Sequence, residues 1–328
     1  MRNEEEHIID VEIRTGHGDN DPIHIFYEIQ NSLIPEGKVF LGDKSLKICR
    51  FCKQDSNQTT FKKVAHVVPE FMGNKKYFSN FECDKCNDFF SAYETSLASY
   101  GGILNTFSLI KGKNGHPKHK GNIEDTETFV RDGQVVIRIH NPESRDSIKS
   151  VQYDEKTGLM TFNTTKYSYV PLDAYKALTK IGLCMLTDDE VLDYELTRKW
   201  LIKEAELDAE IYKPFFLVFQ KTGERLFPHP WTVLLKKRNQ FTNEPCPTHA
   251  LLINYGLFKF QIFLPGNSKD QWIWKGNRLT LPIENLISHS NKDSEKQLSR
   301  SFDIVDFSSA EKLINPRHSF RVPFKSKK

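Results

Sequence analysis

Two Cys-x-x-Cys pairs constrain the fold of this chain more than any other feature of its sequence. Cys49 and Cys52 form the first pair, Cys83 and Cys86 form the second, and thirty residues separate the two pairs. The spacing lets both thiolates of a pair converge on one cation, and four such thiolates make the closed tetrahedral site of structural zinc. A redox dithiol needs only one pair and a thioredoxin-like context, which is absent. We therefore predict one structural Zn²⁺, and we interpret the two remaining cysteines as packed or surface thiols.

Length and composition bound the class of protein. A chain of 328 residues suggests about two domains, and a hydrophobic fraction of 38% is enough for a core. No apolar run approaches the ~18 residues of a membrane span, so no membrane partner is expected. The N-terminus "MRNEEEHIID" is acidic and has no apolar signal-peptide region. This predicts a reducing, cytoplasmic location, where paired cysteines bind metal rather than form disulfides.

The charges are distributed unevenly along the chain. Residues 1–43 carry 3 Lys/Arg and 10 Asp/Glu, a balance of −7, whereas residues 44–120 carry 13 and 6, a balance of +7. Residues 121–328 carry 30 and 27, a balance of +3. A basic segment around the cysteines indicates binding to a polyanion. The same balance also fits a solvated, lysine-rich surface.

Local patterns predict an α+β fold in three parts. We expect residues 1–43 to form an acidic arm packed on a zinc module of residues 44–120. Residues 121–328 are expected to form an α+β domain of unknown type, in which mixed strands flank a helical pair. Its expected elements are strands over 126–170 with a hairpin turn at "DEKTG", a helix from Pro171, a helix with capping-box spacing from Thr187, and strands from residue 213 that include "QWIWKG".

One histidine lies between the two cysteine pairs. His66 occupies a strand-like run, "KKVAHVVPEF", and a helical pattern begins after the second pair at Asn87. A strand and a helix pinned by zinc would place His66 opposite Asn87 and Glu94, which are seven residues apart and share one helix face. The alternative is a half-buried strand histidine whose nitrogens are satisfied by neighbours.

The ordered segments "CRFC", "AHVVPEFMGN", "SNFECDKCN" and "FFSAYE" resemble the HNH endonucleases, the ββα-metal or His-Me finger group, in the branch with two Cys-x-x-Cys pairs. The resemblance covers roughly residues 46–100. It implies a ββα-metal nuclease module in which His66 acts as general base on a water molecule and Asn87 binds a catalytic Mg²⁺ or Mn²⁺. The middle asparagine of the family, which supports the loop and the base, is matched best by Asn80, with Asn74 as the second choice.

One position departs from the family pattern. Many HNH endonucleases carry an acidic metal ligand directly before the histidine, and this chain has Ala65 there. Glu94 is expected to replace this missing carboxylate and so to bind the catalytic cation together with Asn87. Glu70 is a weaker candidate for the same role. Without a substitute carboxylate, the module would be a non-catalytic, zinc-stabilised nucleic-acid-binding protein, which is the alternative function.

Lysines around the proposed site are expected to hold phosphate groups without reading bases. They are Lys62, Lys63, Lys75, Lys76, Lys111 and Lys113, continued by Lys118 and Lys120. We interpret His116 and His119 as extending this basic loop. The expected substrate is DNA, with RNA left open, in a restriction or phage-defence role. A homodimer is expected because one such site cuts one strand, and the C-terminal domain is expected to recognise the target or bind an activating ligand.

Overall fold

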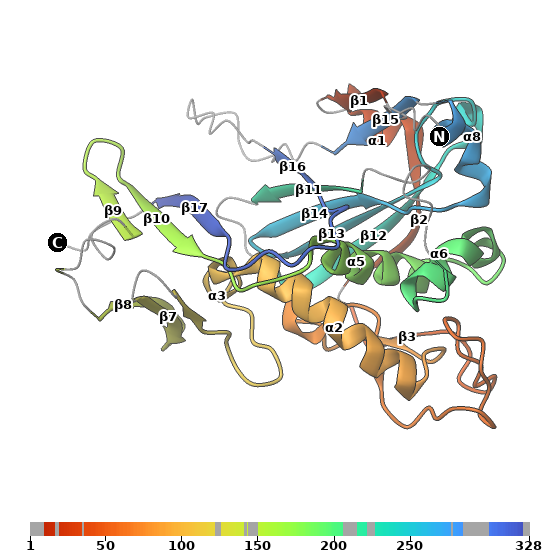
Figure 1. Ribbon diagram of the computed structural model, residues 1–328, viewed down its shortest axis with the longest axis horizontal. Coiled ribbons are helices and arrows are strands. Elements are labelled where there is room, and N and C mark those ends of the chain that lie inside the picture. Colours follow the sequence, from red (N-terminus) through yellow and green to blue (C-terminus); the bar gives the residue numbers. More distant parts are fainter. Residues whose placement is uncertain are drawn as a thin grey trace, which may run out of the picture.

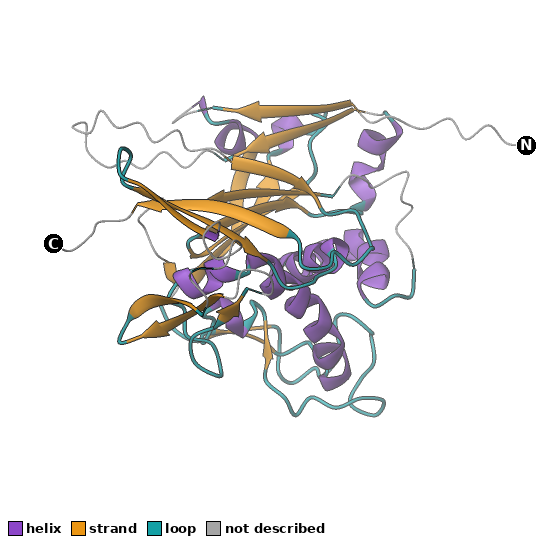
Figure 2. Cartoon of the chain, turned by 60° about the vertical axis from the view of Figure 1, so that its left-hand side comes forward, coloured by secondary structure: helices purple, strands orange, loops and turns teal. Residues whose placement is uncertain are grey.

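The computed structural model describes residues 10–16, 20–34, 36–121, 126–140, 143, 150–205, 215–221, 227–276, 278–284 and 302–323. Within them the fold is α+β, as predicted: a small zinc module and a larger sheet domain lie on either side of a buried helix (Figure 1). Figure 2 shows the long strands gathered in the larger domain, with long helices beneath them and short helices beside the uppermost strands. In the residues that the structure describes, no helix is long and apolar enough to cross a membrane.

The zinc module contains the predicted order of two strands and a helix. Its elements are β3 (Val39–Leu41), β4 (Ala65–His66), the short helix η2 (Glu70–Met72), β5 (Tyr77–Ser79), α2 (Asp84–Gly101) and α3 (Ile103–Phe107). Strand β5 lies in the middle, antiparallel to β4 and parallel to β3. Helix α2 begins at Asp84, three residues before the predicted start, because Cys83 is its N-cap and accepts a hydrogen bond from the backbone of Cys86.

The larger domain is built on a six-stranded antiparallel sheet. Its order is β16 (Phe302–Asp306), β11 (Phe216–Lys221), β14 (Phe258–Phe263), β13 (His249–Gly256), β12 (Phe227–Lys237) and β2 (Tyr27–Leu33). Two three-stranded sheets stand beside it: β6 (His119–Lys120) with β7 (Thr126–Arg131) and β8 (Gln134–Ile139), and β9 (Val151–Asp154) with β10 (Leu159–Thr165) and β17 (Arg317–Pro323). The predicted "DEKTG" turn joins β9 to β10.

Helix α5 (Pro171–Met185) connects the zinc module to the sheet domain. It begins with Pro171, as predicted, and it packs along α2. On its other side, Tyr175 donates a hydrogen bond of 2.6 Å to the carbonyl of Phe263. A Cβ on Gly182 would lie 2.4 Å from the side chain of Leu264, so only glycine allows this close approach. Residues of both parts join in one hydrophobic core. The two parts therefore share an interior rather than meet through a linker.

One predicted helix and one predicted strand differ from expectation. The segment from Thr187 is broken into η3 (Glu190–Tyr194) and α6 (Glu195–Leu201), although the Thr187 hydroxyl does accept a hydrogen bond from the backbone of Glu190. The segment "QWIWKG", predicted as a strand, forms the helix α8 (Gln271–Lys275), which follows directly on the short helix η5 (Ser268–Asp270). Asn267 caps η5 through the backbone of Lys269, which starts a helical turn that the alternating aromatic residues concealed.

The expectation that residues 1–43 form an arm on the zinc module differs from the observed strand pairing. Strand β1 (Asp10–Thr15) pairs in parallel with β15 (Arg278–Ile283), and β2 pairs with β12. Helix α1 (Pro22–Phe26) lies between β1 and β2 and contacts β15. Of the strands described in residues 10–43, β3 is the one that joins the zinc module. The described part of the acidic segment thus belongs mainly to the larger domain, because the strand partners it needs lie there.

Candidate functional site

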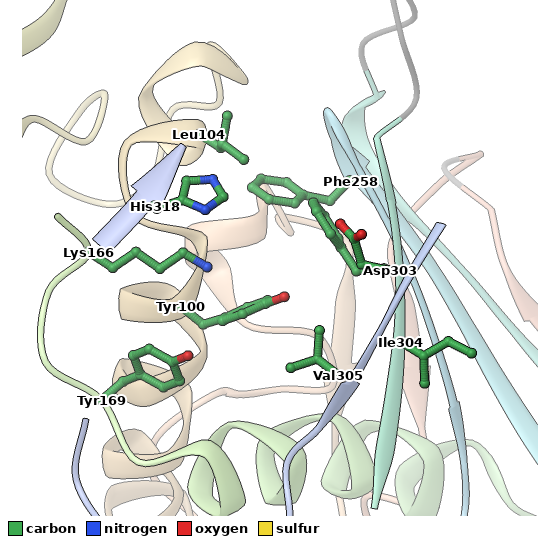
Figure 3. A pocket seen from close by; sticks show the side chains of 10 residues that line it. Tyr100, Leu104, Lys166, Tyr169, Phe258, Asp303, Ile304, Val305 and His318 are labelled. Atoms are coloured by element: carbon green, nitrogen blue, oxygen red, sulfur yellow. The ribbon is translucent and has the colours of Figure 1, made fainter. Parts of the chain in front are cut away.

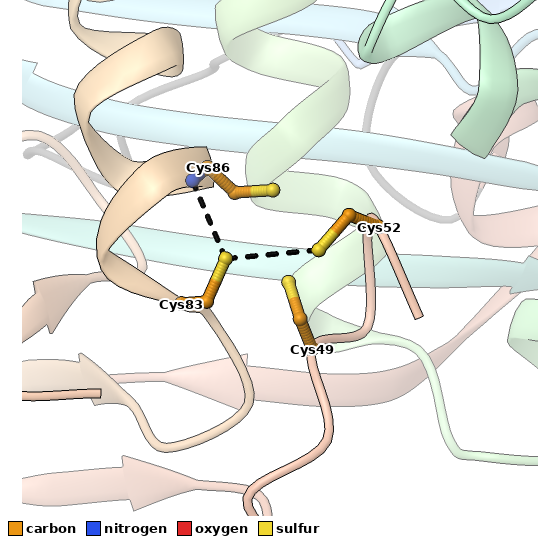
Figure 4. A group of neighbouring side chains, drawn as sticks. All are labelled: Cys49, Cys52, Cys83 and Cys86. Atoms are coloured by element: carbon orange, nitrogen blue, oxygen red, sulfur yellow. Dashed lines mark hydrogen bonds between the residues drawn. The ribbon is translucent and has the colours of Figure 1, made fainter. Parts of the chain in front are cut away.

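The four predicted cysteines converge at the start of α2 (Figure 4). Their Sγ atoms all lie within 4.8 Å of one another, and the Sγ atoms of Cys52 and Cys83 are 3.7 Å apart. Four sulfurs bound tetrahedrally at about 2.3 Å from zinc would be about 3.8 Å apart, so the arrangement fits that ion. Burial raises the pKa of Cys52 to about 11, so four thiolates at neutral pH require a cation among them. The cluster is consistent with a structural zinc site.

The first cysteine pair is held by a helix of the larger domain. Arg50, between the two cysteines, donates hydrogen bonds of 2.8 Å and 2.9 Å to the carbonyls of Leu183 and Leu186, at the C-terminal end of α5. Its guanidinium group also pairs with Asp188 at 2.5 Å and lies 3.9 Å from the ring centroid of Phe81. A buried cation thus satisfies carbonyls that the helix end leaves open.

His66 lies at the end of the short strand β4, opposite Phe78 of β5. Its side chain is half-buried, and its ring packs edge-on against the ring of Phe78 at 5.1 Å. The Nδ2 atom of Asn74 lies 3.4 Å from the Nδ1 atom of His66. His66 is therefore held against the loop that connects β4 to β5, with its ring at the edge of the module.

Asn74, the second choice for the middle asparagine, organises that loop. Its side chain is fully buried, donates to the carbonyls of Val68 and Tyr77 at 2.6 Å and 2.9 Å, and accepts from the backbone of Lys76 and Tyr77. Gly73 precedes it with φ +87°, a conformation that favours glycine.

Asn80, the first choice, has other partners. Its side chain donates 3.0 Å to the carbonyl of Gly42, and its backbone amide donates to Leu41. Of the two asparagines, Asn74 is the one that contacts the histidine and supports its loop. The sequence signal that could have favoured it is its place directly after a glycine in the turn between the strands.

Helix α2 carries the two other candidate residues. Asn87 lies in its first turns with a half-buried side chain, and Glu94 lies two turns later. The carboxylate of Glu94 is 4.0 Å from the Nζ atom of Lys180, and the same Nζ donates 2.6 Å to the backbone carbonyl of His66. Glu94 and the backbone of His66 therefore bind a single ammonium group from opposite elements of the module.

Lys180 and its main partner were not found by sequence reasoning. Lys180 belongs to α5, and its side chain is 2% exposed; it pairs at 3.0 Å with Glu82, whose side chain is 0% exposed. Burial raises the pKa of Glu82 to about 7, against the charge of Lys180. The available signal was a pair of lysines, Lys176 and Lys180, four residues apart within the apolar helix "YKALTKIGLCM".

The environment of His66 favours the neutral imidazole. Burial lowers its pKa; the negative charge of Glu70 opposes this effect, while the positive charges of Lys180 and Lys113 lower the pKa further. Burial raises the pKa of Glu94, and the charge of Lys180 lowers it. A neutral imidazole at neutral pH is the form that can accept a proton.

The predicted phosphate-binding lysines do not form a uniform group. Lys62, Lys75, Lys111 and Lys113 are exposed, and Lys113 lies near enough to His66 for its charge to affect the pKa. Lys63 is paired with Asp88 at 2.6 Å, and Lys76 is half-buried.

The two histidines assigned to the basic loop are not both on its surface. His119 is 1% exposed, and its Nε2 atom lies 3.2 Å from the hydroxyl oxygen of Thr164, so the expectation for this residue was wrong. His116 is half-buried.

A cavity of about 390 Å³ opens at the other end of α2, away from its cysteine-bearing turn (Figure 3). Aromatic rings form much of its wall, and Lys166, Asp303 and His318 add charged or polar groups. Tyr100 of α2 lines it, and the Nζ atom of Lys166 lies 3.8 Å from the centroid of the Tyr100 ring. The cavity shares no lining residue with the histidine site.

Residues 49–95 match the family of HNH endonucleases. The match begins at the first cysteine of the zinc cluster, includes His66, and ends one residue after Glu94. No curated protein and no solved structure matches the chain. This segment is thus similar to a nuclease module of the zinc-binding kind.

Proposed function

We propose that this protein is a metal-dependent endonuclease that hydrolyses phosphodiester bonds in DNA. The observation that carries the proposal is the position of His66. It is a half-buried imidazole with a lowered pKa, and its backbone carbonyl binds the same ammonium group as Glu94 of helix α2, within the segment that matches the HNH endonucleases. Exposed lysines, including Lys113 near the histidine, supply positive charge for a phosphate backbone.

The contacts of His66 support the role of general base. Both hydrogens of the Asn74 amide group are directed to backbone carbonyls, and its oxygen accepts two backbone N–H groups, so the nitrogen of the amide faces the imidazole. Asn74 therefore fixes the orientation of the imidazole ring. In our proposal, the neutral imidazole accepts the proton of the attacking water.

Asn87 and Glu94 are the side chains proposed to hold a catalytic Mg²⁺ or Mn²⁺. Their amide and carboxylate oxygens are the hard donors that these ions prefer, and Glu94 supplies the carboxylate that Ala65 cannot. When bound, such an ion stabilises negative charge on the phosphate and the leaving oxygen. In this arrangement Asn74 orients His66, and helix α2 supplies the carboxylate of Glu94.

A plasmid-nicking assay tests the proposal. Supercoiled plasmid should be converted to the nicked form with added Mg²⁺ or Mn²⁺, and should remain intact without them. A single-stranded RNA substrate in parallel decides between DNA and RNA. Absence of cleavage under all these conditions, in protein that contains zinc, would favour the non-catalytic, nucleic-acid-binding alternative.

The proposed restriction or phage-defence role has a separate test. Cells that express the protein are infected with phage and compared with cells that express His66→Ala. Protection by the parent chain alone supports the role, and equal infection of both strains argues against it.

Alanine substitutions should separate the two candidate asparagines. Asn74→Ala removes a buried amide that joins four backbone groups to the loop below His66, so we expect cleavage to fall by about 10²-fold and the protein to be destabilised by several hydrogen bonds, about 1 kcal/mol each. Asn80→Ala removes one hydrogen bond to a backbone carbonyl and should change cleavage less than threefold. Single-turnover cleavage and urea unfolding measure both effects. Equal losses in the two variants would contradict the assignment to Asn74.

Loss of a metal ligand should be partly reversible by excess metal. Asn87→Ala is expected to raise the Mg²⁺ concentration needed for half-maximal cleavage by about tenfold or more, because one hard oxygen donor is removed. Glu94→Ala should shift the metal dependence in the same direction. Titration of cleavage against Mg²⁺ and Mn²⁺ measures the shift, and Asp88→Ala, an exposed change on the same helix, is the control. A metal dependence identical to that of the control would remove Asn87 from the site.

A further inference from the structure

One lysine of helix α5 contacts the zinc module, which carries the proposed nuclease site. Lys180 projects from α5, and its Nζ atom donates a hydrogen bond of 2.6 Å to the backbone carbonyl of His66. Strand β4 contains only two residues, paired with Ser79 and Phe78 of β5. A charge-assisted bond to its last carbonyl is therefore a large part of what holds this strand in place.

The same ammonium group touches two further parts of the module. It pairs at 3.0 Å with Glu82, the residue before the zinc-cluster cysteine Cys83, and lies 4.0 Å from the carboxylate of Glu94 on α2. The strand of the proposed base, the second cysteine pair and the helix of the proposed metal ligands thus meet at one buried cation. Since Cys83, Cys86 and Glu94 all belong to α2 or its N-cap, this cation links the strand of His66 to that helix.

We infer that Lys180 is a positioning residue of the nuclease site, supplied by the larger domain. Its ammonium group fixes the distance between the backbone of His66 and the carboxylate of Glu94. This inference rests on the proposed function and adds that the site is completed by a helix outside the segment that matches the HNH endonucleases. A displacement of about 1 Å in a catalytic group can lower a rate by about 10²-fold.

A role in stability alone makes a different prediction from a positioning role. Buried ion pairs contribute little net stability, and replacing both partners by uncharged groups of similar size is often neutral. Removing one partner is strongly destabilising, because the other charge stays buried without compensation. Lys180→Met alone would therefore confuse the two roles, whereas Glu82→Gln/Lys180→Met removes the close, fully buried pair and keeps the volume; the more distant Glu94 is partly exposed and keeps its charge.

The test compares this double variant with the parent chain. We expect one zinc per chain, near-parental stability in urea, and DNA binding within threefold of the parent. Single-turnover cleavage at saturating DNA should nevertheless fall by about 10²-fold, because the carbonyl of His66 has lost its donor. Lys176→Met is the matched control: it lies one turn earlier on α5, is also buried, and packs over the ring of Trp200 at 4.6 Å. It should cleave at the parental rate.

A second readout does not depend on cleavage. The pKa of His66 is measured by NMR in labelled protein without DNA or added divalent cations. The charges that act on His66 are those of Glu70, Lys180 and Lys113. The double variant removes the positive charge of Lys180 and keeps the other two, so its His66 pKa should be higher than that of the parent. When the cleavage rate is measured against pH, the rise on the acid side should occur at higher pH in the double variant, by the same amount as the His66 pKa.

The outcomes separate this inference from the proposed function. A double variant that cleaves at the parental rate, with an unchanged His66 pKa, would show that Lys180 only stabilises the fold and would overturn the inference. A parent chain that does not cleave DNA would overturn the proposed function, and the His66 pKa would then still decide whether Lys180 acts on the histidine.

Discussion

The variant His66→Ala is expected to lose DNA cleavage by about 10²- to 10⁴-fold, the usual cost of removing a general base. Zinc content should stay at one ion per chain, because the histidine is not among the four clustered cysteines. The fold should also persist, since the side chain is only half-buried and its polar contact is the long one to Asn74, at 3.4 Å. Single-turnover cleavage of a labelled duplex, at saturating protein and Mg²⁺, measures the loss.

His24→Ala provides the matched control. His24 is exposed on α1 in the larger domain, so the same chemical change should leave cleavage within twofold of the parent. In the parent chain, cleavage should rise with pH through the His66 pKa, because only the neutral imidazole accepts a proton, and the midpoint should lie below the ordinary histidine value because burial lowers that pKa. Parental cleavage by His66→Ala would remove this histidine from the mechanism.

The second large effect is expected from the zinc cluster. Cys49→Ser should abolish zinc binding and unfold the zinc module. Zinc binding contributes about 10–16 kcal/mol to the folding free energy of small zinc domains at neutral pH. The module has only short strands around the cysteines, and Cys49 itself is fully buried. Elemental analysis measures the zinc, and hydrogen exchange of the β4, β5 and α2 amides measures the local unfolding.

The chain contains a suitable control thiol. Cys246 is buried in the larger domain and lies outside the four-sulfur cluster, so Cys246→Ala should keep one zinc per chain and protected module amides. Protected amides in Cys49→Ser without zinc would mean that the shared core, rather than the metal, maintains the module.

The predictions that agree with the structure rest on local spacing. The convergence of four thiols and the strand–strand–helix order follow from residues close together in sequence, as does the helix that starts at Pro171. In each case the physical constraint acts within a few residues: two cysteines on one tight turn, a proline at the first helical position, a glycine-containing turn between short strands.

The features that could not be predicted depend on contacts between distant residues. Lys180 contacts His66 across 114 positions in the sequence, and no local pattern around either residue indicates this contact. The acidic N-terminal segment is expected from the sequence to pack on the basic module, but β1 and β2 find their hydrogen-bonding partners in β15 and β12. Strand pairing satisfies backbone groups at short range, whereas charge complementarity over a solvated surface is weak and screened by salt.

The parallel pairing of β1 with β15 has a consequence for synthesis of the chain. Asp10 is made long before its strand partner Arg278, and the cation that supports His66 belongs to a helix that follows the whole zinc module. A growing chain can gather its four cysteines early, but Glu82 stays without its counter-ion until α5 has emerged. Folding of the N-terminal strand waits longer still, because non-local pairing must await its partner. Translation itself thus postpones assembly of the proposed cutting site until α5 has emerged, so that a chain interrupted before Pro171 would hold the zinc module without the cation that supports His66.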